Sequence, residues 1–247
     1  MKLYVKNYPE VIFVFFYLIF HLYFFDLDPI NDEYIFYTGA ELIKTSKIEL
    51  IEIFFLYNAN TLGFSYLIFL LSKILNVDNL YLLSKIISCS GYLFLYFGLL
   101  NFFKLFKIEK RLELIVLIFF CPLIFIYGFR ATPDFFSFSL SFFSSTFILN
   151  SKNIFKKILY FLLLSIAVII KPINGITLIF IFLYFFLYKK KELYDFKNIL
   201  GFLLFILLTF IFFYFNYKNF GFLVRPPNWT NLDTTNKNLI LNFIYYL

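Results

Sequence analysis

The chain alternates between long apolar runs and short segments that carry most of its charged residues. An α-helix needs about 20 mostly apolar residues to cross about 30 Å of hydrocarbon, and somewhat fewer where the bilayer is thin. The pattern therefore predicts an all-α fold, a single polytopic transmembrane helical bundle with about seven spans. The predicted spans are residues 11–25, 80–103, 114–129, 135–149, 158–170, 173–188 and 199–215.

Composition agrees with this pattern. The 247 residues are 62% apolar and 26% aromatic, and their mean hydropathy is +0.84, whereas soluble domains are usually about 45–50% apolar. Disorder requires low hydrophobicity, and two cysteines cannot staple a fold of this size, so both of those classes are excluded. The net charge of +7 indicates no nucleic-acid partner, because Lys and Arg beside apolar spans act first as topology signals. The expected surroundings are membrane lipids.

The basic residues also predict the orientation of the spans. Residues 61–75 are a further apolar segment, which either crosses the membrane or lies at its outer surface or re-enters. If this segment does not cross, most Lys and Arg residues fall in cytoplasmic loops, as the positive-inside rule requires. The first span could be mistaken for a cleaved secretory signal peptide, but no small-residue cleavage site follows it. We therefore expect it to remain in the protein as a transmembrane helix. We expect an integral, multi-pass protein of a bacterial inner or plasma membrane, with a cytoplasmic N-terminus.

This orientation gives the non-cytoplasmic side four polar segments. They are residues 26–60, 130–134, 171–175 and 218–237. Residues 31–75 would form an outer loop with amphipathic surface or re-entrant helices. Residues 218–247 would form an outer tail that looks truncated, because its last residues resemble the start of another helix.

The first outer segment carries Asp28 and the adjacent carboxylates Asp32 and Glu33. Asn31 is a good N-cap, and ionised carboxylates in the first helical turn are favoured by the helix dipole. Adjacent helical side chains point about 100° apart, so one carboxylate can face a substrate while the other pairs with a neighbour. Phe36 and Ala40 follow four residues apart and predict a narrow apolar face that lies on the membrane surface.

The other outer segments supply cations. Arg130 and Asp134 lie between two spans, and Lys171 precedes a proline inside a long apolar stretch. An ionisable residue at membrane depth is costly unless it pairs with an acid or lines a cavity. The last segment contains Arg225 and Trp229. A simpler structural interpretation remains open for three of the outer segments. The first can be a solvated acidic loop, Arg130 can snorkel beside a helix cap, and Lys171 can lie in a tight turn between short spans.

Several kinds of site have no pattern in this sequence. His21, Cys89 and Cys121 are isolated from one another, so buried packing is expected for them rather than metal binding. There is no Gly-rich phosphate loop and no Ser-His-Asp set. A divalent cation, Mg²⁺ or Mn²⁺, held between carboxylates and a phosphate is neither indicated nor excluded by the spacing.

In this order and sidedness the segments resemble the GT-C superfamily of polytopic glycosyltransferases that use lipid-phosphate sugars. The likeness is to the protein O-mannosyltransferase, aminoarabinose-transferase and dolichyl-phosphate-glucose families. It rests on Asp32-Glu33 after the first span, continued by Phe36 and Ala40, on the turn 130–134, and on Lys171-Pro172. It covers roughly residues 11–188, and family members are usually longer, so the chain resembles an N-terminal portion. A fragment, a split gene and a degenerate copy all fit this likeness, and a partner subunit is one source of the missing spans.

The resemblance implies a donor, a reaction and roles for these residues. A sugar on a polyprenyl phosphate would be transferred to a lipid, glycan or protein acceptor at the non-cytoplasmic face. The implied catalytic residues are Asp32, as general base, and Glu33, which orients it or pairs with a cation. The implied donor-phosphate ligands are Arg130, Lys171 and Arg225, and the implied supporting residues are Asp28, Tyr34, Asp134 and Trp229.

Two other functions remain open at this stage. An exopolysaccharide or O-antigen polymerase shares lipid-linked substrates and similarly placed Arg residues. A non-catalytic membrane scaffold or flippase-like protein would instead distribute charges along a path through the membrane, and Lys85 is the charged residue that lies within a predicted span.

Overall fold

The computed structural model describes residues 8–22, 31–45 and 62–220, and every regular element in these ranges is helical. The all-α prediction is therefore confirmed for the described part of the chain. The first half contains α1 (Tyr8–Leu22), α2 (Asn31–Lys44), α4 (Gly63–Leu75), α5 (Leu80–Phe106), α6 (Arg111–Phe119) and α7 (Pro122–Tyr127). The second half contains α8 (Pro133–Asn150), α9 (Ile154–Ile170), the 3₁₀ turn η2 (Pro172–Gly175), α10 (Ile176–Tyr188), α11 (Lys190–Leu193) and α12 (Phe196–Phe220).

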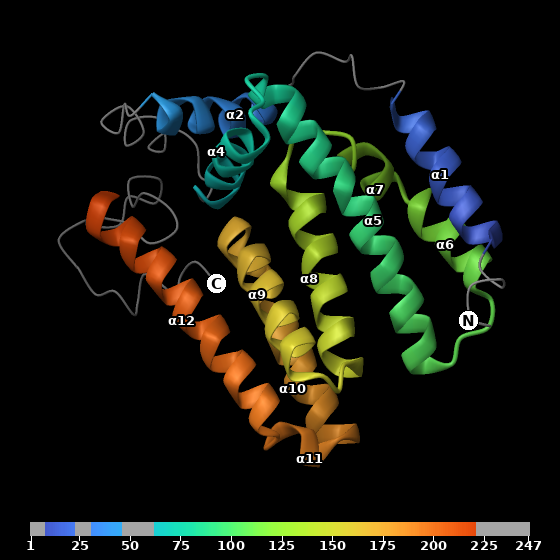
Figure 1. Cartoon of the computed structure of the whole chain (residues 1–247). Helices are drawn as coiled ribbons and strands as arrows, with labels where there is room; N and C mark the ends of the chain where they lie inside the picture. Colours follow the sequence, from blue (N-terminus) through green and yellow to red (C-terminus); the bar gives the residue numbers. More distant parts are fainter. Residues whose placement is uncertain (1–7, 23–30, 46–61, 221–247) are drawn as a thin grey trace, which may run out of the picture.

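The long helices run up and down between two ends of the bundle (Figure 1). Short connections join α5 to α6, α8 to α9 and α10 to α12, so consecutive long helices are antiparallel. We call the end that carries these three connections the Lys157 end. The opposite end, here the Glu33 end, carries α2, the α7–α8 turn and the break between α9 and α10 (Figure 1).

Local sequence signals explain where several helices begin and end. The Asn79 side chain accepts a hydrogen bond from the Leu82 N–H (2.9 Å) at the start of α5, and Asn153 caps α9 in the same way. At their C-terminal ends, α4 and α5 are closed by Asn76 and Lys107 in the left-handed conformation, with φ of 54° and 55°.

Predicted spans and observed helices agree for α5, α8, α9 and α12 to within a few residues at each end. The predicted span 114–129 is wrong as one helix. It is broken into α6 and α7 at Cys121–Pro122, because proline lacks the N–H that a continuing helix would use. The span 173–188 begins with the turn η2, and residues 23–25 of the first span lie outside the described residues.

Two of the described helices are long and apolar enough to cross a membrane, α5 over Leu80–Phe106 and α12 over Phe196–Lys218. Pro9–His21, Gly63–Leu75 and Pro172–Tyr188 are shorter apolar helices. The prediction of about seven spans is therefore not confirmed by helix length and composition.

The helix α4, whose membrane placement was ambiguous in the sequence, lies against α2 along its length. Leu62, at the start of α4, packs against Leu42 and Ile43 of α2. Just beyond the other end of α4, Asp78 accepts a hydrogen bond of 2.8 Å from the Lys44 ammonium of α2. Both ends of α4 therefore lie close to the last turn of α2.

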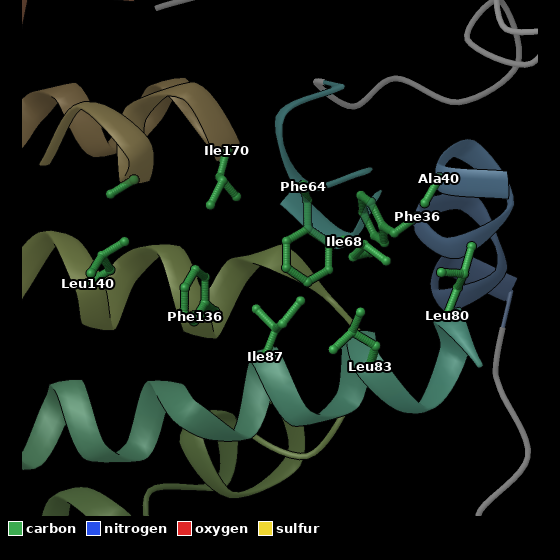
Figure 2. Packing of buried hydrophobic residues seen from close by; sticks show 11 residues of the cluster. Phe36, Ala40, Phe64, Ile68, Leu80, Leu83, Ile87, Phe136, Leu140 and Ile170 are labelled. Atoms are coloured by element: carbon green, nitrogen blue, oxygen red, sulfur yellow. The ribbon is translucent and has the colours of Figure 1, made fainter. Parts of the chain in front are cut away.

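A hydrophobic cluster joins α2 and α4 to the long helices (Figure 2). It contains Phe36 and Ala40 of α2, which are 3% and 0% exposed, together with side chains of α4, α5, α8 and α9. The sequence correctly indicated an apolar face at these two positions but assigned it to the membrane surface. That assignment is wrong, because the face is buried against Phe64 and Ile68 of α4 and the ends of the bundle helices (Figure 2).

Candidate functional site

Three segments that are far apart in the sequence bring charged side chains together at the Glu33 end. The first turn of α2 carries Glu33, the turn between α7 and α8 carries Arg130, and the break after α9 carries Lys171. Asp134 lies in the first turn of α8, directly after the Arg130 turn.

The Glu33 carboxylate is fully buried and makes contacts that an ionised group requires. Its Oε1 accepts a hydrogen bond of 2.7 Å from the Ala131 N–H, and its Oε2 lies 3.5 Å from Nη1 of Arg130. A buried carboxylate is tolerated only when it is paired and hydrogen-bonded in this manner. Glu33 therefore ties α2 to the α7–α8 turn and fixes the Arg130 guanidinium, which is 19% exposed.

The backbone of the Arg130 turn is held from both sides. The Thr132 N–H donates to the Arg130 carbonyl (2.7 Å), and the Ser88 hydroxyl of α5 donates to the Thr132 carbonyl (2.8 Å). Pro133 then begins α8, where its missing N–H costs no hydrogen bond. The turn is therefore anchored to α2 through Glu33 and to α5 through Ser88.

Two buried polar atoms of the Arg130 turn have no hydrogen-bond partner among the described residues. They are Arg130 Nε and Thr132 Oγ1. Buried donors without partners are uncommon in folded proteins and are destabilising. A guanidinium N–H and a hydroxyl are groups that bind the oxygens of a phosphate or a sugar.

A second ion pair adjoins the first. The Lys171 ammonium donates to Oδ1 of Asp134, and this contact joins the end of α9 to the start of α8. Both side chains are partly exposed, at 33% for Lys171 and 46% for Asp134, so each retains an open side toward the surroundings. The helix ends here because Pro172 follows, and the Lys171 N–H donates to the Ala167 carbonyl as the last bond of α9.

An apolar cavity of about 390 Å³ opens beside Lys171. Its lining includes Pro172 and Ile173 of the break, Val168 of α9, and Phe205 and Phe213 of α12. Thr209 is a polar residue of its wall, and its hydroxyl is already bonded to the Phe205 carbonyl (2.8 Å). We call this space the outer cavity. Lys171 directly precedes the lining residue Pro172 but does not itself line the cavity.

Other residues proposed from the sequence fall outside this cluster or outside the description. Tyr34 is half exposed on α2, with its ring centroid 5.5 Å from that of Tyr37. The helix α2 includes Asp32, but its side chain lies outside the described residues, as do Asp28, Arg225 and Trp229.

The isolated histidine is a packing residue. His21 is fully buried, with Nδ1 2.8 Å from the Tyr17 carbonyl and Nε2 3.2 Å from the hydroxyl of Tyr92. Cys89 and Cys121 are free and partly buried. Within the described ranges, no three His, Cys, Asp or Glu side chains lie close enough together to hold a metal ion.

Sequence reasoning missed Ser88 and Thr132. Ser88 is one of several serines on α5, and nothing in its spacing distinguishes it from Ser84 or Ser90. Thr132 lies within a segment that the sequence did identify, but its buried hydroxyl becomes evident only in three dimensions.

The chain matches no protein-family model, and no curated protein or solved structure is similar to it.

Proposed function

We propose that the chain is a multi-pass membrane glycosyltransferase. It would take a sugar from a polyprenyl-phosphate donor and transfer it to a lipid, glycan or protein acceptor at the non-cytoplasmic face. The observation that carries this proposal is the meeting of Glu33 with Arg130 and Ala131, next to the Asp134–Lys171 pair. Acids and cations from separate helices thus share one end of the bundle, as a site for an anionic, hydroxyl-rich substrate needs.

The distribution of charge supports the proposed orientation. Basic side chains crowd the connections at the Lys157 end, where they are Lys104, Lys107, Lys110, Arg111, Lys152, Lys156, Lys157, Lys189, Lys190, Lys191 and Lys197. Cytoplasmic loops accumulate Lys and Arg, so the Lys157 end would be cytoplasmic and the Glu33 end would face outward. The N-terminus would then be cytoplasmic, in a bacterial inner or plasma membrane.

The donor would be held by its phosphate and its hydrocarbon chain. The unpartnered Arg130 Nε–H and the partly exposed Lys171 ammonium are the cations that would contact the phosphate. The polyprenyl chain would leave through the outer cavity, which begins at Pro172, the residue after Lys171. Cations fixed in a site that excludes water stabilise a phosphate leaving group more strongly than the same groups in water.

In the proposed reaction an acceptor hydroxyl attacks the anomeric carbon of the donor sugar. Asp32 takes the hydroxyl proton, the new glycosidic C–O bond forms, and the bond between the anomeric carbon and the phosphate oxygen breaks. The electron pair of that bond stays on the phosphate, whose charge Arg130 and Lys171 would stabilise. Glu33 acts as a positioning residue, because its carboxylate holds the Arg130 turn in place.

The proposal is tested first by binding. The purified protein in detergent should bind undecaprenyl phosphate and should bind undecaprenol, which lacks the phosphate, much more weakly. Loss of a charge-assisted hydrogen bond is worth about 1.5–3 kcal/mol, so Arg130→Gln should weaken phosphate binding roughly 10- to 100-fold. Arg111→Gln, at the opposite end, is the matched control and should have little effect. Equal binding of the two lipids would contradict the proposal.

Transfer is tested in proteoliposomes that contain radiolabelled undecaprenyl-phosphate glucose, mannose or aminoarabinose. Loss of label from the lipid should occur with one of these donors, and Asp32→Asn should abolish it while leaving undecaprenyl-phosphate binding unchanged. Joining of lipid-linked repeats instead of single-sugar transfer would identify a polymerase. Full activity of the Asp32→Asn variant would remove Asp32 from the proposed role of base.

A further inference from the structure

A second apolar cavity lies between α10 and α12, toward the Lys157 end. It has a volume of about 180 Å³, and its lining includes Ile181 and Phe185 of α10, Leu193 of α11, and Phe202 and Leu203 of α12. We call it the inner cavity. It shares Leu178 with the outer cavity, so the two spaces follow one another along the same pair of helices.

The two helices that form these walls meet through an aromatic contact. The rings of Phe182 and Phe202 pack edge to face, with their centroids 5.1 Å apart. Leu203 and Ile199 of α12 are 57% and 44% exposed beside the inner cavity. The space is therefore an apolar groove accessible from the side of the bundle, which is the position of a lipid chain in a membrane.

A buried polar atom lies in the wall of the inner cavity. Asn198 is 5% exposed, and its Nδ2 donates to the Glu192 carbonyl at 2.6 Å. Its Oδ1 is buried and accepts no hydrogen bond from the residues that the structure describes. A buried amide oxygen is destabilising without a donor, so this position favours a ligand that brings a hydroxyl group.

The connection at the mouth of this cavity is strongly basic. Its lysines are Lys189, Lys190, Lys191 and Lys197. Of its two acids, Glu192 is paired, with Oε2 2.8 Å from the buried Lys157 ammonium. Asp195 Oδ1 accepts only the neutral backbone N–H of Lys197 at 3.1 Å, so one carboxylate stands against the four lysines.

The lysines of this connection make hydrogen bonds to neutral groups or are exposed. The ammonium groups of Lys189 and Lys197 donate to the carbonyls of Leu149 and Lys152, both at 3.1 Å, and a bond to a neutral carbonyl does not cancel the charge. Lys190 and Lys191 are exposed. An anion at this mouth would therefore be attracted by several cations at once.

We propose that the inner cavity and this lysine-rich connection bind an anionic phospholipid with a hydroxyl-bearing headgroup, such as phosphatidylglycerol. One acyl chain occupies the groove between α10 and α12, the phosphate lies at Lys190 and Lys191, and a headgroup hydroxyl donates to Asn198 Oδ1. Basic pockets between helices at the cytoplasmic side of a membrane bind anionic headgroups in this way. The inference shares the membrane insertion and orientation of the proposed function but not its sugar transfer.

The test measures the lipid preference of the purified protein by native mass spectrometry and by thermal stability. The protein should retain phosphatidylglycerol in preference to phosphatidylcholine, and only phosphatidylglycerol should raise the melting temperature. A lysine near an anionic headgroup contributes roughly a fivefold factor, so Lys190→Gln with Lys191→Gln should reduce the preference roughly 25-fold. The control variant, Lys104→Gln with Lys110→Gln, removes the same amount of charge at the same end of the bundle but away from the cavity. It should leave the preference for phosphatidylglycerol unchanged.

Two further measurements test the groove and the headgroup hydroxyl. Leu203→Trp, which fills the inner cavity from an exposed position, should reduce the binding of both lipids while circular dichroism shows unchanged helix content. Soluble glycerol phosphate should not compete, because it has no chain for the groove. Phosphatidylmethanol, a phosphodiester with the same single charge but no headgroup hydroxyl, should bind less well than phosphatidylglycerol. Equal retention of phosphatidylglycerol and phosphatidylcholine, or equal effects of the two lysine pairs, would overturn the proposal. Both outcomes are independent of any transfer assay.

Discussion

The contact between Glu33 and Arg130 can be tested by a double-mutant cycle. Glu33→Gln removes the negative charge but keeps a side-chain oxygen that can accept the Ala131 N–H, so the change is confined to the ion pair. Arg130→Gln removes the opposite charge. The double variant leaves neither charge buried alone, and the cycle therefore isolates the pairwise energy.

The structure sets the expected magnitude. Breaking a fully buried ion pair costs about 3–5 kcal/mol, because the remaining charge is left uncompensated. Here the Nη1–Oε2 distance is 3.5 Å and the Arg130 side chain is 19% exposed, so the expected cost of breaking the pair is lower. We expect each single variant to lose about 2–3 kcal/mol of unfolding free energy, and a coupling energy of about 1–2 kcal/mol.

The assay is reversible unfolding of the purified protein in mixed micelles, followed by circular dichroism. The matched control is the pair Lys44–Asp78, whose atoms are closer, at 2.8 Å, but whose side chains are 41% and 98% exposed. Exposed pairs are screened by solvent, so Lys44→Gln and Asp78→Asn should show no measurable coupling. A Glu33–Arg130 coupling no larger than that of the control would refute the claim that Glu33 holds the Arg130 turn.

Two further predictions concern packing and pH. Gly63→Ala should destabilise the protein by about 1–3 kcal/mol, because the added Cβ would lie 2.2 Å from the backbone oxygen of Ile169. The control is Gly175→Ala, whose Cβ would meet no atom within 4 Å, so its unfolding free energy should be nearly that of the wild type. The hydrogen bond from Lys157 lowers the pKa of Glu192 below its ordinary 4.5, so the pair stabilises the fold fully above pH 4.5 and loses this effect as the pH falls through the lower native value. Melting temperatures measured from pH 7 to pH 3 should show this loss of stability in the wild type and not in Glu192→Gln. Equal acid sensitivity of the two proteins would contradict the role of the Lys157–Glu192 pair. A Gly63→Ala variant as stable as the wild type would contradict the packing argument.

The helices that the sequence predicted well are those whose apolar runs are bounded by local signals. The start of α5 follows the capping residue Asn79, and α9 ends before Pro172. Short connections and an up-and-down order also made it predictable that Arg130 and Lys171 lie at the same end. Such features depend on neighbours in the chain, which a single sequence contains.

Other features depend on tertiary packing and were not predictable. The helical pattern places an apolar face on α2, but whether Phe36 meets lipid or protein is decided by α4, whose position no local signal gives. The same holds for Glu33, because its bonds to Arg130 and Ala131 join residues almost a hundred positions apart. Pro122 was a visible breaker inside an apolar run, and the expected span 114–129 gave it too little weight.

The central claim is that the first turn of α2, the Arg130 turn and the Lys171 break share the outward-facing end of the membrane bundle. It is tested most directly by single cysteines introduced into a variant without Cys89 and Cys121 and labelled in intact cells with a membrane-impermeant maleimide. Cysteines at the exposed positions Tyr34 and Ile173 should both react from outside, and a cysteine at Lys190 should react only after permeabilisation. If the cysteine at position 34 and the cysteine at position 173 react from opposite sides of the membrane, the account is contradicted.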